Sequence, residues 1–169
     1  MNDPLAYFIT FSCKGARLPG DPRGSVDRDH NTFGAEFVEP NPIRAESEAN
    51  RMDHPPVVLD PSQRAAIKAA IQGVAVYRCW TIHACAVRSN HVHVVVSAAG
   101  STPERVMQDF KAYATRRLRQ AGLVPRDLRP WTRHGSTIYL WNENAVAETT
   151  NYVRERQDDP ERYASEPRL

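Results

Sequence analysis

The chain is poor in cysteine and contains no long apolar run. Its 169 residues include three cysteines, Cys13, Cys79 and Cys85, none of them in a CxxC pair. An odd, scattered set of thiols argues against a disulfide framework and favours a reducing compartment. No apolar run approaches the length of about 18 residues that a membrane span needs, and the N-terminal MNDPLAYFITF lacks the basic-then-apolar layout of a signal peptide. We therefore expect a cytoplasmic protein.

The length is that of one domain. A chain of 169 residues can bury a sufficient core without the support of metals or disulfides. We expect a single domain over residues 1–160 and a polar tail over 161–169. Residues 13–59 are rich in Pro, Gly, Asp and Asn and poor in periodicity, so we predict that they form a long irregular insertion.

Positive charge is concentrated in the middle of the chain. The formal net charge is only +2, but residues 61–140 contain 12 basic and 3 acidic side chains. Residues 1–60 contain 6 basic and 10 acidic side chains, and residues 141–169 contain 4 and 7. A segment this basic favours a polyanionic partner, most simply nucleic acid. A merely solvated surface would mix the two signs more evenly.

Two histidines stand one residue apart in SNHVHVVV, residues 89–96. The β-branched run predicts a buried strand. Alternate side chains of a strand lie on one face, so His91 and His93 should point the same way. Such a pair could bind a divalent metal, or it could consist of ordinary strand histidines bonded to the backbone. The strand alone does not separate the two readings.

Periodicity and cap residues predict a βαββαβ order with one more helix. Asp60-Pro61 and Thr102-Pro103 each combine an N-cap residue with a proline at the first helical position. The order is the ferredoxin-like arrangement, an α+β fold with an antiparallel sheet, in which the histidine strand is the third and pairs with the first in the centre. The predicted strands are 6–12, 78–87, 91–98 and 136–140, and the predicted helices begin at 61 and 103 and span about 143–157.

These stretches together resemble a known family. SNHVHVVV is similar to the histidine-hydrophobic-histidine motif of HUH endonucleases, and the late helix with YVRERQ resembles the one that carries the nucleophilic tyrosine in their single-tyrosine transposases. The stretches YFITFSCKGARLPGDPRG, FKAYATRRL and RHGSTIYLW resemble one branch of this insertion-sequence transposase group, the REP-associated tyrosine transposase-like proteins. The likeness spans nearly the whole chain.

The resemblance implies a reaction. Members of this family nick single-stranded DNA, transfer strands through a covalent 5′-phosphotyrosine and work as homodimers. For this chain the resemblance implies hairpin or REP-like DNA as the substrate. The resemblance implies that Tyr152 is the nucleophile and that His91 and His93 hold Mg²⁺ or Mn²⁺. A rival nucleophile is Tyr113, although its place near an apolar helix stripe favours a packing role.

The third metal ligand is the weak point of the resemblance. In the family it lies four residues after the tyrosine, where this chain has Arg156, and our candidate, Gln157, is one residue further along. An ideal helix would put Gln157 about 140° from Tyr152. Either the helix end widens, or Gln157 reaches round from a frayed turn, or water and phosphate complete the coordination.

The candidate DNA contacts are polar and basic residues around the histidine strand and on the following helix. They are Arg88, Asn90, Arg105, Lys111, Arg116, Arg117, Arg119 and Arg133. His83, on the strand before the pair, could support it or simply pack.

Two other functions stay open from the sequence. A non-catalytic single-stranded nucleic-acid-binding protein on the same fold would need only basic charge and exposed aromatic side chains. A HIT-type nucleotide hydrolase would need a third alternate histidine, where this chain has Val95.

Overall fold

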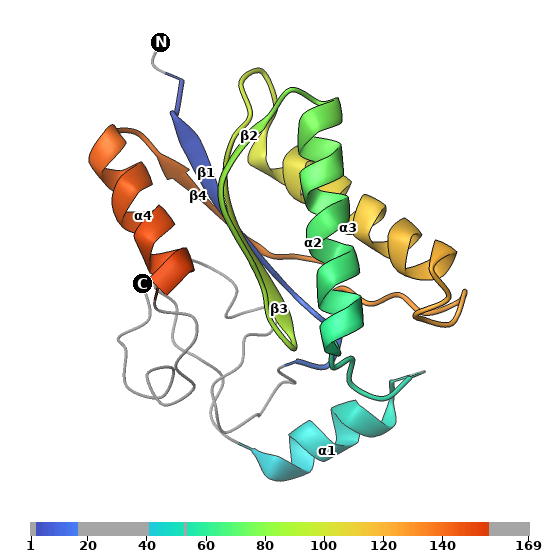
Figure 1. The fold of residues 1–169 in the computed structure, drawn as a ribbon. Coiled ribbons are helices and arrows are strands. Elements are labelled where there is room, and N and C mark those ends of the chain that lie inside the picture. The colour runs from blue at the N-terminus through green and yellow to red at the C-terminus, as the bar shows by residue number, and fades with distance from the viewer. Residues whose placement is uncertain (1–2, 17–40, 53, 156–169) are drawn as a thin grey trace.

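The computed structural model describes residues 3–16, 41–52 and 54–155 (Figure 1). Four strands form one sheet in the order β2-β3-β1-β4, and every pairing in it is antiparallel. The elements in chain order are β1 (Ala6–Ser12), α1 (Pro42–Asn50), α2 (Pro61–Tyr77), β2 (Thr81–Val87), β3 (His91–Ser97), α3 (Pro103–Gln120), β4 (Ser136–Leu140) and α4 (Glu143–Glu155).

The expected α+β fold with the histidine strand in the centre is confirmed. β3 pairs with β1 on one side and with β2 on the other, and Thr10 of β1 lies opposite His93. Five consecutive residues of β3, from Val92 to Val96, are buried. A strand that is covered on both faces has apolar residues at consecutive positions, which is why the valines of β3 do not alternate with polar residues.

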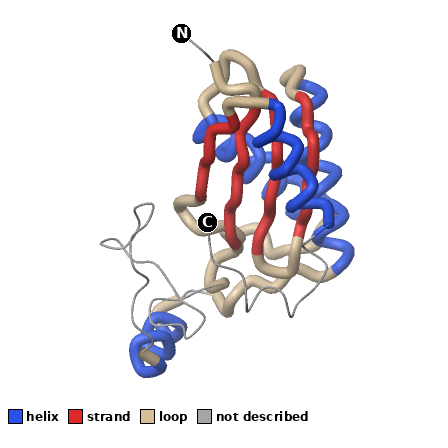
Figure 2. The backbone as a smooth tube through the Cα atoms, turned by 90° about the vertical axis from the view of Figure 1, so that its left-hand side faces the viewer, coloured by secondary structure: helices blue, strands red, loops and turns tan. Residues whose placement is uncertain are grey.

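Helices cover both faces of the sheet. α2 and α3 lie against one face and α4 against the other (Figures 1 and 2). The larger core, between the sheet and α2 and α3, contains Phe11 and Phe110. The smaller cluster, under α4, contains Val95 and Val153. Because side chains alternate along β3, His93 shares the face of Val95 and looks toward α4.

A short helix interrupts the segment that we expected to be irregular. Pro42–Asn50 forms α1, with the side chain of Asn41 accepting a hydrogen bond from the backbone N–H of Arg44. The expectation for residues 13–59 is therefore wrong over this stretch. α1 buries none of its nine residues within the described chain, so it has no apolar stripe that would reveal it. Its signal is the cap-plus-proline pair, which Asn41 and Pro42 share with α2 and α3.

β2 begins three residues later than predicted, because α2 ends in a tight cap. Cys79 has a left-handed backbone with φ of 59°. Its N–H donates to the carbonyl of Val76 at 3.2 Å, and the N–H of Trp80 donates to the carbonyl of Ala75 at 2.8 Å. This pair of hydrogen bonds is a common way for a helix to end and for the chain to reverse. Residues 78–80 thus belong to the turn and not to the strand.

The other boundaries are close to prediction. β1 and β4 have the predicted limits, α3 starts at the predicted proline, and β3 ends one residue earlier than expected. In the ranges that the structure describes, no helix combines the length and apolar character needed to cross a bilayer.

We expect Gly135→Ala to destabilise the protein. A Cβ there would lie 2.5 Å from the carbonyl oxygen of Thr10 and 2.5 Å from the sulfur of Met107, both in the centre of the fold. Overpacking of this kind lowers the free energy of unfolding by about 1–3 kcal/mol, which urea titration measures.

Gly73→Ala is the matched control. A Cβ at this exposed position of α2 meets no atom within 4 Å, so the substitution should raise stability by about 0.5–1 kcal/mol. Equal effects of the two substitutions would contradict the tight approach at Gly135.

Candidate active site

The two histidines of β3 lie side by side on the face that α4 covers. Their ring centroids are 4.7 Å apart and the ring planes meet at 76°. His93 is only 8% exposed, whereas His91, at the end of the strand, is half-buried. The prediction that the two rings share one face is confirmed.

Hydrogen bonds orient both rings. Oδ1 of Asn90 lies 2.7 Å from Nδ1 of His91. Because an amide oxygen only accepts, that nitrogen carries a proton, and the lone pair of a neutral His91 is then on Nε2. The hydroxyl of Thr10 lies 2.7 Å from Nδ1 of His93. Polar partners at one ring nitrogen are what orient histidines that bind metals through the other.

His93 is held in its neutral form. Its pKa is lowered from 6.5 to about 3, chiefly by burial and to a smaller extent by the positive charges that His91 and Arg88 can carry. A histidine must be neutral to bind a metal. At neutral pH the ring of His93 is therefore in the required state before any metal arrives.

Tyr152 approaches the histidines through Phe8. The ring of Phe8 stacks on His93 with centroids 5.4 Å apart, and it meets Tyr152 edge to face at 6.4 Å. Tyr152 is half-buried and packs against the small cluster under α4. The predicted nucleophile and the predicted metal ligands thus lie on one side of the sheet, joined by one aromatic side chain.

Phe8 and Thr10 are site residues that the sequence analysis missed. They alternate on β1, and the register of β1 with β3 places Phe8 opposite Val95 and Thr10 opposite His93. The antiparallel pairing of the two strands was predicted, but not the register that brings these two side chains to the histidine pair.

The two histidines fit part of a metal site. Two imidazoles suit Mn²⁺ better than Mg²⁺, which prefers oxygen ligands. Among residues 3–16, 41–52 and 54–155 there is no group of three His, Cys, Asp or Glu side chains that could hold a metal. Gln157 and Arg156 lie outside the described residues.

The rival tyrosine is on the opposite side of the sheet. Tyr113 belongs to α3 and packs against the larger core, and the guanidinium of Arg116 lies 5.4 Å from its ring centroid. A sheet layer separates α3 from the side of His93. This placement favours the packing role for Tyr113.

Seven of the eight predicted DNA contacts fall into two groups, and Arg133 stands apart from both in the loop between α3 and β4. Arg88 and Asn90 stand in the turn between β2 and β3, directly before His91. The residues of α3 lie on the opposite face of the sheet from the histidine pair. Those residues are Arg105, Lys111, Arg116, Arg117 and Arg119.

Several cations of the second group also have partners within the protein. Nζ of Lys111 donates to the carbonyls of Thr132 and His134 at 2.9 and 3.1 Å, and burial lowers its pKa. This lysine thus holds the loop that carries Arg133. Arg119 donates to a carbonyl at 2.9 Å and Arg105 pairs with a carboxylate at 3.4 Å.

Comparisons with known proteins bear on this site. The sequence model of the family described as "Transposase IS200 like" matches residues 56–156, which is more than half of the chain. That range includes β3 and all of α4. No curated protein matches the chain in sequence.

Solved structures share the fold. A transposase candidate from Deinococcus radiodurans R1 matches with a TM-score of 0.52 and 14% identity, over 92% of this chain and 93% of its own. The REP-associated tyrosine transposase bound to a REP hairpin matches with a TM-score of 0.52 and 13% identity, over 90% of this chain. The chain spans 66% of that second protein, so a third of it has no counterpart here.

The buried neutral His93 makes stability depend on pH. The folded pKa of about 3 lies below the ordinary value of 6.5, so the unfolded chain takes up a proton first as the pH falls. The contribution of the neutral His93 to the free energy of unfolding is therefore complete above pH 6.5 and is lost as the pH falls toward 3. We expect the metal-free protein to lose about 2 kcal/mol more than a His93→Gln variant between pH 7.5 and 5.

Urea unfolding with a chelator present measures this difference. Subtracting the variant removes the effect of other titrating groups. The same pH dependence in both proteins would show that His93 is not the buried neutral base.

Proposed function

The chain belongs to the family of IS200-like transposases, and on this premise we propose that it cuts and rejoins single-stranded DNA through a covalent bond to Tyr152. The observation that carries the proposal is the shared face of the sheet, on which Phe8 contacts both the buried His93 and Tyr152. The reaction would take place on DNA in the cytoplasm.

The tyrosine hydroxyl is the attacking group. Its oxygen would give up its proton and bond to the phosphorus of a phosphodiester, and the 3′ oxygen would leave and take up a proton in exchange. The product is a 5′-phosphotyrosine with a released 3′ hydroxyl. The ester keeps the reactivity of the broken bond, so another 3′ hydroxyl can displace the tyrosine and join two strands without ATP. A phenol with an ordinary pKa of about 10 is a weak nucleophile at neutral pH, so the site has to activate it.

His91 and His93 would hold a divalent metal beside the scissile phosphate. When bound, such an ion offsets the charge that develops on the phosphate oxygens. The protein's own part is to keep the imidazoles neutral and aligned. Burial keeps His93 neutral. The contacts of Asn90 and Thr10 with the Nδ1 atoms align the two rings.

Charge supports a DNA substrate. Arg88 and Asn90 stand at the end of β3 where His91 begins the strand, which suits them to hold the backbone near the scissile bond. The basic α3 would contact more distant phosphates on the other face of the sheet. A fold relative was solved with a REP hairpin, which supports hairpin DNA as the substrate class.

We also propose a homodimer joined at the edge of the sheet. β4 is an edge strand of the described sheet, and Tyr139 near its end stacks on Trp141 directly after it; the two side chains are 43% and 56% exposed. Unpaired edge strands with exposed aromatic side chains favour association. Light scattering at micromolar protein should give twice the 19.1 kDa chain mass, and a monomeric mass would count against this arrangement.

A covalent-adduct assay tests the reaction. Wild-type protein, Tyr152→Phe and Tyr113→Phe are incubated with labelled single-stranded hairpin DNA and Mn²⁺, and adducts that resist denaturation are counted by gel electrophoresis. We expect adducts with the wild type and with Tyr113→Phe, and none with Tyr152→Phe, because the phenylalanine has no hydroxyl to form the ester.

The other outcomes are equally informative. No adduct with the wild type on any cognate hairpin would favour the non-catalytic single-stranded nucleic-acid binder. An adduct that persists in Tyr152→Phe and disappears in Tyr113→Phe would move the nucleophile to α3.

A further inference from the structure

β2 carries a bulge at His83. The register between β2 and β3 shifts between Ile82 and Ala84, so His83 is the extra residue of the pairing. A bulged residue is left out of the regular ladder and redirects its side chain and carbonyl. The bulge lies on the strand that α4 contacts.

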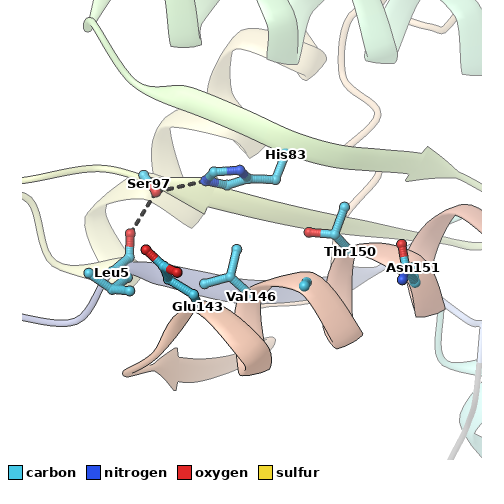
Figure 3. A pocket seen from close by; sticks show the side chains of 8 residues that line it. Leu5, His83, Ser97, Glu143, Val146, Thr150 and Asn151 are labelled. Atoms are coloured by element: carbon cyan, nitrogen blue, oxygen red, sulfur yellow. Dashed lines mark hydrogen bonds between the residues drawn. The ribbon is translucent and has the colours of Figure 1, made fainter.

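The side chain of His83 is fixed by a chain of hydrogen bonds. Ser97 of β3 donates its hydroxyl proton to the carbonyl of Leu5 at 2.6 Å. A hydroxyl has one proton to give, so the 2.8 Å contact between Ser97 and Nε2 of His83 is a bond that the imidazole donates. Figure 3 shows the two hydrogen bonds that join the imidazole and the leucine carbonyl to the serine hydroxyl beside α4. The bulge is thereby tied to β3 and to the residue directly before β1.

The carbonyl of His83 accepts a hydrogen bond from α4. Nη2 of Arg154 donates to it at 2.6 Å. A guanidinium is always charged, and a charged donor makes a bond about twice as strong as a neutral one. Arg154 follows Tyr152 by two residues in the last turn of the helix. The bond therefore connects the end of α4 that carries the predicted nucleophile to the sheet.

The apolar contact of α4 with the sheet is small. Val153 is the one buried residue of Glu143–Glu155, and Ala145, Val146 and Tyr152 pack against the same cluster while partly exposed. A groove of about 490 Å³ lies along the helix, between Val146 and Thr150 on one side and His83 on the other (Figure 3). Along the groove the helix lacks the close-packed neighbours that fix side chains in a filled interior. A directional bond at its end supplies a constraint that packing does not supply there.

We propose that Arg154 is a positioning residue, whose hydrogen bond to the carbonyl of His83 sets the place of Tyr152 relative to His91 and His93. This inference rests on the proposed function, since it concerns the same nucleophile. Arg154 itself does not touch the reacting atoms. A displacement of the nucleophile by about 1 Å can slow an enzyme by about 100-fold, so the loss of one such bond matters for rate more than for folding.

Single-turnover kinetics at saturating hairpin DNA and Mn²⁺ test the role. We expect Arg154→Ala to lower the rate constant of adduct formation by at least about 10-fold, with the final amount of adduct and the DNA dissociation constant within about twofold of the wild type. Arg154→Lys keeps the charge and one donor, so it should recover part of the rate. Arg126→Ala removes the same charge from an exposed loop residue and should leave the rate constant unchanged.

Two results would contradict the proposal. A smaller final amount of adduct with an unchanged rate constant would mean that Arg154 only keeps molecules folded. An equal loss of rate in Arg126→Ala would mean that net charge is the cause.

A second readout does not need the reaction. Protein labelled with 3-fluorotyrosine gives one ¹⁹F resonance for each tyrosine, and Tyr152→Phe identifies the one that belongs to Tyr152. We expect Arg154→Ala to shift or broaden this resonance, and Arg126→Ala to leave it in place. If the wild type forms no adduct, the proposed function fails, and the resonance alone decides whether Arg154 positions Tyr152. An unmoved resonance would overturn the inference in either case.

Discussion

The pairing of β1 with β3 in the centre of the sheet is the constraint on which the rest of the structure depends. Both strands have neighbours on each side, and helices cover both faces. The register of this pair places Thr10 opposite His93 and Phe8 opposite Val95. It therefore decides which hydroxyl orients the histidine and which ring connects it to α4. A one-residue slip would turn all of these side chains to the other face.

The parts of this arrangement that depend on local patterns could be predicted from the sequence. The valine content indicates β3, and the alternating direction of side chains along a strand indicates the shared face of His91 and His93. Cap-plus-proline pairs mark the starts of α2 and α3. The parts that depend on distant contacts could not. The roles of Phe8 and Thr10 follow from strand register, which a single sequence does not specify.

Charge counting shows the same limit. It identified a basic segment but not the faces on which the charges stand. Arg88 and Asn90 lie next to the histidine pair, while α3 lies across the sheet from it. The amine of Lys111 is bonded to loop carbonyls. The site thus combines His91 and His93 on the central strand with Tyr152 on α4, a helix that contacts the sheet through Val153, a few partly buried side chains and the hydrogen bond of Arg154.

We propose that Tyr152 becomes bonded to DNA beside the histidine pair. Peptide mapping of the wild-type adduct, trapped with hairpin DNA and Mn²⁺ and digested with trypsin and nuclease, identifies the bonded residue. We expect a nucleotide on the peptide of residues 134–154, which fragmentation localises to Tyr152 and not to Tyr139. A nucleotide on the peptide of residues 112–116, which contains Tyr113, or on no tyrosine at all, would contradict the proposal.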